Sequence, residues 1–347
     1  MGGRPPFRAG IRRMRYSRIV STGISLPDKV VTNDDIARMV DTTDEWIFAR
    51  TGIRERRVGK PEEVTSDFAA IAGKQALDRA GMQPEEVEAI IVATITPDLP
   101  YPATACLAQT KLGAKNAFAF DVSAACTGYV YALSIADAYI RSGQCENVLV
   151  IGADMMARTL NWKDRGSCIL FADGAGATLV RASDEPGVRY TELGSDGEHA
   201  ELIYIPAGGT RTPASHDTVA QDLHYTVLDG REVYKLAVRY AEQLTTSALE
   251  KNGLSPDDVD LLVPHQANQR ITDAVQERLG IAKEKVVSNI EKYGNTSAAT
   301  IPLCLDDAIR DGRLKKGDLV LMVAFGAGYL PAHRASRVDP MFALRYE

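Results

Sequence analysis

The chain repeats a short pattern at half its length, and this repeat constrains the fold more than any other feature. GMQPEEVEAIIV begins at Gly81 and GLSPDDVDLLV begins at Gly253, 172 residues later. Each segment indicates the end of a helix, a turn of proline and acidic residues, and a buried strand. A second pair, DAYIRSGQCENVLVIGA and DDAIRDGRLKKGDLVLMVAFGA, places Gly143 and Gly312 169 residues apart. A period this long predicts two similar domains that pack face to face, because solenoid repeats are much shorter.

Apolar runs alternate with helical patterns in both halves, which is typical of α/β domains with parallel sheets. The expected strands are Ala89–Thr94, Ala117–Val122, Val148–Ile151, Leu261–Val263, Lys285–Val287 and Leu319–Ala324. The expected helices are Asp67–Ala80, Cys126–Ser142, Val233–Asn252, Gln269–Leu279 and Thr296–Asp311. We therefore expect one half over residues 16–183 and a second over residues 184–347, with a loop-rich insertion over the site at residues 184–229.

Composition argues against several classes of protein. The 347 residues carry a formal net charge of −6, whereas nucleic-acid-binding proteins are usually basic. The five cysteines include no Cys-x-x-Cys pair, so neither a zinc site nor a dithiol centre is expected. No secretory signal and no membrane-spanning apolar run are visible, so we expect a cytoplasmic protein. The arginine-rich residues 1–15 are expected to be a disordered extension or a start assigned too early.

Cys126 stands where a short apolar run ends and a helical pattern begins, in DVSAACTGYVYALSIADAYI. An apolar stripe from Val130 to Ile140 places this cysteine in the first turn of the helix, among backbone N–H groups that have no partner inside it. Such a position can lower the pKa of a thiol and so favour the reactive thiolate. The small neighbours Ser123 and Gly128 leave room for a substrate. A buried packing cysteine is common too, so the residues alone leave both roles open.

Polar residues stand at similar places in the second half. Adding about 170 residues to Cys126 reaches KYGNTSAAT, where Asn295 occupies the corresponding helix start. His265 directly follows the expected strand Leu261–Val263, at the edge where open α/β sheets bind ligands. A lone histidine is more often structural, but the polar segment HQAN around this one indicates a site rather than a core.

Four segments together, DTTDEWIFARTGIRERR, DVSAACTG, HQAN and YGNTSAA, resemble the β-ketoacyl-[acyl-carrier-protein] synthase III family of condensing enzymes. The resemblance covers residues 16–328. It implies a thiolase-like α/β fold, in which two duplicated βαβαβ halves form five layers in the order α-β-α-β-α. It also implies a decarboxylative Claisen condensation, in which an acyl-CoA and malonyl-acyl carrier protein give 3-oxoacyl-acyl carrier protein, CoA and CO₂, to initiate fatty acid or related acyl-chain synthesis. Neither a cofactor nor a metal is implied, and the expected assembly is a homodimer.

The resemblance gives each motif residue a role. Cys126 would be the nucleophile that holds the acyl group, while His265 and Asn295 would donate hydrogen bonds to the enolate formed from malonyl carrier protein. Backbone N–H groups of Cys126 and Ala327 would form the oxyanion hole. The family usually has glycine where this chain has Ala327, and an alanine serves there only if its φ is negative. The tail after Tyr329 also departs from the usual end of the family.

Further contacts are implied by the same resemblance. The residues that would contact acyl-CoA are Trp46, Arg50, Arg165, Gly230, Tyr234, Asn268 and Phe325. The adenine of CoA would lie between Trp46 and Arg165. The less favoured alternatives are a core aromatic at the end of a helix for Trp46 and a surface ion pair for Arg165. The residues that would receive the carrier protein are Gln266, Ala267, Asn268, Gln269 and Arg270. Tyr101 would reach the acyl pocket of the partner subunit.

Two other functions are compatible with the same scaffold. One is a thiolase-fold acyltransferase of secondary metabolism that acts without decarboxylation. The other is a catalytically impaired CoA-binding homologue, which the unusual tail would explain. Retention of His265 and Asn295 favours condensation over both. The length and branching of the acyl primer do not follow from the sequence, because residues far apart in the chain shape the acyl pocket.

Overall fold

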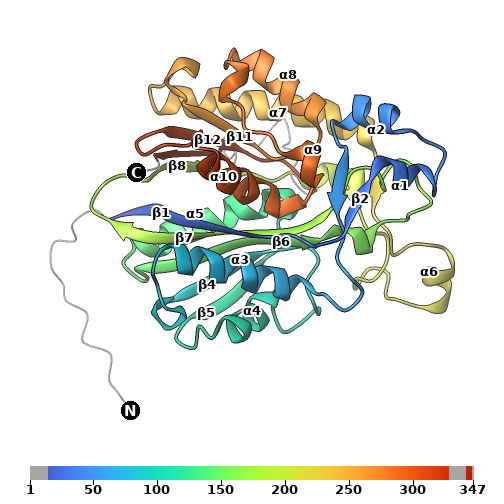
Figure 1. Cartoon of the computed structure of the whole chain (residues 1–347), viewed down its shortest axis with the longest axis horizontal. Helices are drawn as coiled ribbons and strands as arrows, with labels where there is room; N and C mark the ends of the chain where they lie inside the picture. The colour runs from blue at the N-terminus through green and yellow to red at the C-terminus, as the bar shows by residue number, and fades with distance from the viewer. Residues whose placement is uncertain (1–14, 328–340, 346–347) are drawn as a thin grey trace.

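The computed structural model describes residues 15–327 and 341–345 of the chain. Residues 1–14, which hold nearly all of the expected N-terminal extension, lie outside the described residues, as does most of the tail after Tyr329. Two sheets and three layers of helices are stacked in the order α-β-α-β-α (Figure 1). The layering implied by the family resemblance is therefore confirmed.

The first sheet is formed entirely by residues 16–183. Its strands, in spatial order, are β1 (Tyr16–Ser25), β7 (Asp173–Ser183), β6 (Asn147–Met155), β4 (Ala89–Ala93) and β5 (Phe118–Val122). β4 is parallel to β5 and β6, whereas β7 is antiparallel to β6 and β1. The expectation of a parallel sheet is therefore wrong for β7, which runs opposite to the other four strands and makes antiparallel pairs with both β6 and β1. Two strands that follow each other in the chain can be parallel only if a crossover connection, usually an α-helix, lies between them. The helical element between β6 and β7 is a short 3-10 turn, so these two strands are antiparallel.

The second sheet has the spatial order β11 (Leu261–Pro264), β12 (Leu319–Val323), β13 (Met341–Arg345) and β8 (Val188–Glu192). β11 and β12 are parallel, and β13 is antiparallel to both β12 and β8. Because β8 completes this sheet, the expectation of a loop-rich insertion over 184–229 is wrong for that part of the range. The expected strand Lys285–Val287 forms a single bridge, between Leu262 and Val286, after a 3-10 turn of charged residues.

Helices cover the outer faces of both sheets and fill the space between them (Figure 1). The helices on the first sheet are α3 (Thr65–Arg79) and α4 (Thr104–Leu112). Those on the second sheet are α7 (Gly230–Lys251) and α8 (Gln269–Leu279). The central layer consists of α5 (Gly128–Arg141) and α10 (Thr300–Arg310), whose apolar side chains join one core with residues of both sheets. Burial of that shared core holds the two halves together.

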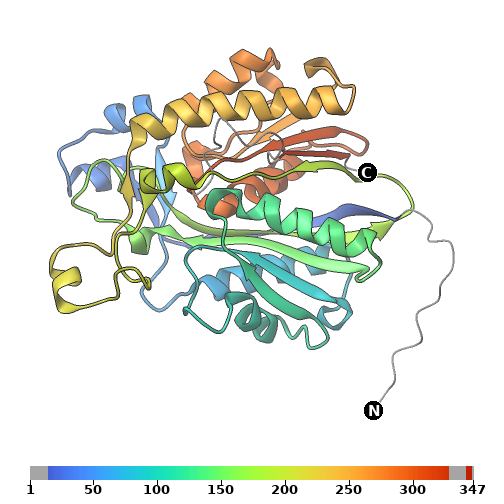
Figure 2. The same cartoon turned by 180° about the vertical axis from the view of Figure 1, so that it is seen from behind.

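Shorter elements complete the described chain. They are β2 (Val30–Thr32), α1 (Asn33–Ala37), α2 (Asp44–Thr51), β3 (Glu55–Arg57), β9 (Ile203–Tyr204), α6 (His216–Ala220), β10 (Val227–Leu228) and α9 (Ile290–Tyr293). α1, α2 and the lobe that carries α6 lie at one end of the molecule, as Figures 1 and 2 show from opposite sides. Within residues 15–327 and 341–345, no helix combines the length and apolar character needed to cross a membrane.

The two central helices begin in the same unusual way. A 3-10 turn, Ala125–Thr127, precedes α5, and another, Ser297–Ala299, precedes α10. Ala125 has a φ of 47° and Ser297 a φ of 52°, a region that residues other than glycine rarely occupy. The two residues are 172 positions apart in the chain, which is the spacing of the sequence repeat. Each half therefore carries the same strained turn at the start of its central helix.

Candidate active site

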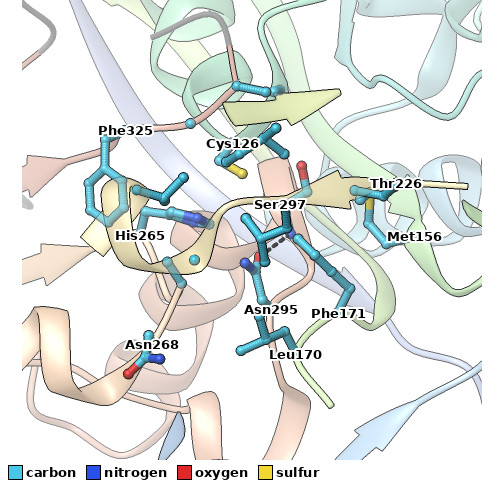
Figure 3. Close-up of a pocket in the computed structure, with 18 of the residues that line it drawn as sticks. Cys126, Met156, Leu170, Phe171, Thr226, His265, Asn268, Asn295, Ser297 and Phe325 are labelled. Atoms are coloured by element: carbon cyan, nitrogen blue, oxygen red, sulfur yellow. Dashed lines mark hydrogen bonds between the residues drawn. The ribbon is translucent and has the colours of Figure 1, made fainter. Parts of the chain in front are cut away.

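One cavity of about 840 Å³ is lined by side chains from both halves of the chain. The first half contributes Cys126 and Phe171, and the second contributes His265, Asn295 and Phe325. Figure 3 shows the side chains of Cys126, His265 and Asn295 around a common space. The structure thus brings together the three residues that the sequence motifs single out.

Cys126 lies in the 3-10 turn before α5, directly after the strained Ala125. The α-helix itself starts at Gly128, two residues later than the sequence pattern predicts. Gly326 packs directly on the cysteine, because a Cβ added to Gly326 would stand 2.8 Å from the Cβ of Cys126 and 3.0 Å from its backbone nitrogen. Only glycine permits so close an approach without displacing the cysteine. Gly326 is therefore part of the site, although the sequence motifs did not mark it.

The surroundings of the Cys126 thiol oppose its ionisation. Burial raises the pKa of Cys126 to about 12; the Ser297 hydroxyl lowers this pKa and the nearby charge of Asp154 raises it. The lowering of the pKa that a helix start can produce is therefore outweighed at Cys126 in the resting protein. Loss of hydration around the sulfur outweighs the partial charges of the helix start.

Alkylation of Cys126 is expected to depend steeply on pH, because the thiolate is the reactive form. Since the pKa is about 12, the rate constant for iodoacetamide should rise about tenfold per pH unit between about pH 7 and pH 9. Mass spectrometry of the modified peptide measures this rate, and Cys126→Ala gives the background from the partly exposed Cys106. A plateau that begins near neutral pH would mean that the helix start dominates after all.

His265 follows β11 at the carboxyl end of the second sheet. Its backbone N–H donates to the carbonyl of Val323 at 2.8 Å, and its Nδ1 lies 2.7 Å from the hydroxyl oxygen of Thr300. The imidazole meets Phe325 edge-on, with ring centroids 5.5 Å apart. Burial lowers the pKa of His265 to about 3, so the imidazole is neutral at pH 7.

Asn295 is held by both its backbone and its side chain. Its backbone N–H donates to the carbonyl of Leu170 at 3.0 Å, and its own carbonyl accepts the N–H of Ala172 at 2.9 Å. The side-chain Oδ1 accepts the backbone N–H of Ser297 at 2.9 Å. With Oδ1 engaged in this way, the amide nitrogen is the group of Asn295 that a substrate in the cavity can meet (Figure 3).

A buried carboxylate that the sequence motifs missed connects the two halves beside the site. Asp154 lies near the end of β6, where its Oδ1 accepts hydrogen bonds from the hydroxyls of Thr94 and Thr96 at 3.0 and 2.9 Å. Its Oδ2 accepts the backbone N–H of Ala298, in the turn before α10, at 3.2 Å. Burial raises the pKa of Asp154. An acid at the end of the apolar strand VLVIGADM is the signal that could have identified it.

The residues expected to contact CoA fall into two groups. Those that line the cavity are Arg50, Gly230, Tyr234, Asn268 and Phe325. Trp46 and Arg165 instead form a cluster with Arg50. The guanidinium carbon of Arg50 lies 4.5 Å from the centroid of the Trp46 ring, and the guanidinium carbon of Arg165 lies 4.8 Å from the same centroid. A flat ring inserted between Trp46 and Arg165 needs about 7 Å, two layers of van der Waals contact. Arg165 must therefore move before an adenine can stack between them.

The segment expected to receive the carrier protein is only partly accessible. Its exposed and partly exposed members are Ala267, Asn268, Gln269 and Arg270. Gln266 is fully buried, and its side-chain nitrogen donates to the carbonyls of Pro264 and Val287 at 2.7 and 3.3 Å. The expectation of a docking role is therefore wrong for Gln266, which holds the loop after β11 in place.

The last two predicted positions differ in their relation to the cavity. Ala327 lines it next to Gly326, and its φ is not positive, so an alanine fits here without backbone strain. Tyr101, in contrast, precedes α4 with 86% of its surface exposed, and it does not line the cavity of its own chain.

Comparison with known proteins finds relatives that cover most of the chain. The family described as 3-oxoacyl-[acyl-carrier-protein (ACP)] synthase III matches residues 120–197, and its C-terminal part matches residues 249–333. The β-ketoacyl-[acyl-carrier-protein] synthase III of Caldanaerobacter subterraneus subsp. tengcongensis is 51% identical over 311 residues, which cover 89% of this chain and 94% of that protein.

Solved structures of related enzymes have the same fold. The crystal structure of 3-oxoacyl-[acyl-carrier-protein] synthase III from Aquifex aeolicus is 46% identical with a TM-score of 0.86, over 95% of this chain and 100% of that chain. The corresponding synthase III from Thermus thermophilus is 41% identical with a TM-score of 0.86, over 95% and 99% of the two chains. The chain belongs to the β-ketoacyl-[acyl-carrier-protein] synthase III family of condensing enzymes.

Proposed function

We propose that the chain catalyses the decarboxylative condensation of an acyl-CoA with malonyl-acyl carrier protein, giving 3-oxoacyl-acyl carrier protein, CoA and CO₂. The observation that carries this proposal is the convergence of Cys126, His265 and Asn295 on one cavity shared by the two halves. A thiol nucleophile and two neutral hydrogen-bond donors are what the two steps of this reaction need. The names of the relatives, which cover most of the chain, support the same reaction.

The first step transfers the acyl group to Cys126. The sulfur attacks the carbonyl carbon of the thioester, a new C–S bond forms, the bond to CoA breaks, and the thiol proton of Cys126 leaves with CoA. Backbone N–H groups of Cys126 and Ala327 stabilise the oxyanion that develops on the carbonyl oxygen. The contact between Gly326 and Cys126 supports this assignment, because it brings residues 326–327 next to the sulfur-bearing residue.

The second step forms the new carbon–carbon bond. Malonyl carrier protein loses CO₂, and its remaining two-carbon unit becomes an enolate. The side-chain nitrogens of Asn295 and His265 donate hydrogen bonds to the enolate oxygen. The enolate carbon then attacks the acyl-Cys126 carbonyl, and the sulfur leaves and regains a proton from solvent. Since one well-placed oxyanion donor is worth about 10²- to 10³-fold in rate, these two donors carry much of the catalysis.

Release of CO₂ is the test that separates this function from its rivals. The purified protein is incubated with a panel of acyl-CoAs, malonyl carrier protein is added, and CO₂ and carrier-bound products are measured. Acylation of Cys126 without CO₂ release would identify a non-decarboxylating acyltransferase. Failure of every acyl-CoA to acylate Cys126 would identify an impaired CoA-binding homologue.

The arginines beside Trp46 are proposed to bind the nucleotide end of CoA. Arg165→Ala and Arg50→Ala are each expected to raise KM for acyl-CoA about tenfold and to leave kcat within about twofold, because they lose charge and stacking contacts remote from the sulfur. Steady-state kinetics at saturating malonyl carrier protein measures both constants. Arg313→Ala, which removes a guanidinium paired with Asp311 beyond α10, is the matched control. A fall in kcat at unchanged KM would contradict the assignment.

The carrier protein is proposed to dock around Arg270. This exposed side chain lines the cavity and lies over Tyr234, with the guanidinium carbon 5.4 Å from the ring centroid. Arg231 and Lys235 also line the cavity, and of these Lys235 is paired with Glu232 at 2.6 Å. Among the residues that the structure describes, the lining includes no acidic one, so the approach is positively charged and suits an acidic partner. An increase of KM for malonyl carrier protein with salt would support this docking site, and a KM independent of salt would contradict it.

A homodimer is proposed from the free edge of the first sheet. β5 is the last strand of that sheet, and its Phe118 is 47% exposed. An exposed edge strand with an aromatic side chain is suited to pair with a second copy. The exposed Tyr101 could then reach the acyl pocket of the partner subunit. Sedimentation velocity tests the assembly, and a monomer at micromolar concentration would contradict it.

A further inference from the structure

The imidazole of His265 contacts one side chain to which the sequence motifs give no role, the hydroxyl of Thr300. Because burial keeps the imidazole neutral at pH 7, only one of its two ring nitrogens carries a proton. The position of that proton is set by the hydrogen bond that the other nitrogen makes. In this structure Nδ1 lies 2.7 Å from the hydroxyl oxygen of Thr300, the first residue of α10.

The Thr300 hydroxyl has one proton and two possible acceptors. One is Nδ1 of His265 at 2.7 Å, and the other is the backbone carbonyl of Ser297 at 3.0 Å. The Ser297 carbonyl already accepts the backbone N–H of Thr300 at the end of the 3-10 turn. It therefore keeps a partner when the hydroxyl turns away, and the nearer acceptor, Nδ1, is open to the hydroxyl proton.

We propose that Thr300 is a positioning residue: its hydroxyl donates to Nδ1 of His265 and so holds the imidazole proton on Nε2. Nε2–H is then the group that His265 offers to the cavity, and it can donate to the enolate oxygen. This inference rests on the proposed function, in which His265 acts as a donor. The opposite tautomer would turn a lone pair toward the enolate and oppose the decarboxylation step.

The start of α10 thus orients both enolate donors. The backbone N–H of Ser297 holds Oδ1 of Asn295 at 2.9 Å, which turns the amide nitrogen to the substrate. The hydroxyl of Thr300, three residues later, holds Nδ1 of His265. Because these two contacts come from one rigid helix start, the two donors keep a fixed relation to each other.

The tautomer can be measured directly in the wild-type protein. Imidazole ¹⁵N–¹H correlation spectra of histidine-labelled protein distinguish a protonated ring nitrogen from a bare one. The signals of His265 are assigned among the five histidines by their loss in His265→Ala. The proposal expects a protonated Nε2 and a bare Nδ1. A protonated Nδ1 at neutral pH would overturn it, whatever the activity of the protein.

Variants of Thr300 test the consequence for each step. Thr300→Val removes the hydroxyl with little change of shape, and we expect malonyl decarboxylation to fall about tenfold as one hydrogen bond is lost. Acylation of Cys126 should stay within about twofold. Thr300→Ser keeps the hydroxyl and should restore both decarboxylation and the Nε2–H signal.

A matched control is available in α7. Thr245 is fully buried and its hydroxyl has no hydrogen-bond partner in the described part of the chain, so Thr245→Val makes the same substitution without removing a contact. Equal decarboxylation by Thr300→Val, Thr300→Ser and wild type would overturn the positioning role. If wild-type protein releases no CO₂, the proposed function fails, while the spectra still report the tautomer.

Discussion

Asn295→Asp is expected to slow the decarboxylation of malonyl carrier protein by about 10²- to 10³-fold, the typical effect of losing one oxyanion donor. In the wild-type protein, Oδ1 of Asn295 accepts the backbone N–H of Ser297 at 2.9 Å. The aspartate keeps an oxygen in the place of Oδ1, so the substitution preserves this hydrogen bond of the turn. The donating nitrogen is replaced by an oxygen whose negative charge also opposes an enolate. His265→Ala is expected to have a similar effect, since it removes the second donor.

Acylation separates a specific loss of this donor from general damage. Both variants should still take up an acyl group from acyl-CoA on Cys126, seen by mass spectrometry of the intact protein, because neither residue takes part in that transfer. Asn116→Asp gives a control substitution of an exposed amide that lies outside the cavity lining and donates to the backbone carbonyl of Glu85 at 2.8 Å. If Asn295→Asp loses acylation together with CO₂ release, the division of roles between the two steps is wrong.

Cys126→Ala is expected to give the converse result. Without the sulfur no acyl adduct can form, and condensation should fall by at least about 10⁴-fold, as it does when other enzymes lose a nucleophile. The enolate donors Asn295 and His265 remain, so malonyl carrier protein should still lose CO₂ slowly without forming a condensed product. Mass spectrometry of the protein and analysis of carrier-bound acyl chains measure the two outcomes.

The matched control for this variant is Cys106→Ala, which removes the one other cysteine in the described chain that is not fully buried. It should keep wild-type acylation. An acyl adduct that persists in Cys126→Ala, or that disappears in Cys106→Ala, would exclude Cys126 as the nucleophile. Together with Asn295→Asp, these variants assign one step of the reaction to each half of the chain.

Sequence reasoning was most successful where the information is local. The repeat near Gly81 and Gly253 predicted two packed halves, and the motifs around Cys126, His265 and Asn295 predicted residues that the structure places in one cavity. Strand direction was less accessible, because β7 runs opposite to the other strands of its sheet, and the direction of a strand is decided by its connections rather than by its apolar pattern. The role of β8 was missed for the same reason, since its partner β13 lies at the far end of the chain.

The environment of each side chain could not be predicted from its neighbours in sequence. Burial raises the pKa of Cys126, and residues from both halves of the chain cause that burial. The motif around the cysteine does not reveal which distant residues will cover it. Gln266 stands in a polar segment, yet the fold buries it completely. The repeat also places Ala298, rather than Asn295, opposite Cys126, since Ala298 stands 172 residues after the cysteine.

The pairing of Asn295 with Leu170 and Ala172 has an evolutionary consequence. The amide belongs by sequence to one copy of a duplicated domain, but its backbone is fastened to the other copy. A shift of the backbone in either copy would therefore move Asn295 relative to Cys126, which links the divergence of the two copies. Substitutions that move the backbone of residues 170–172 are therefore expected to be accompanied by compensating substitutions around residues 294–298, which pair with it.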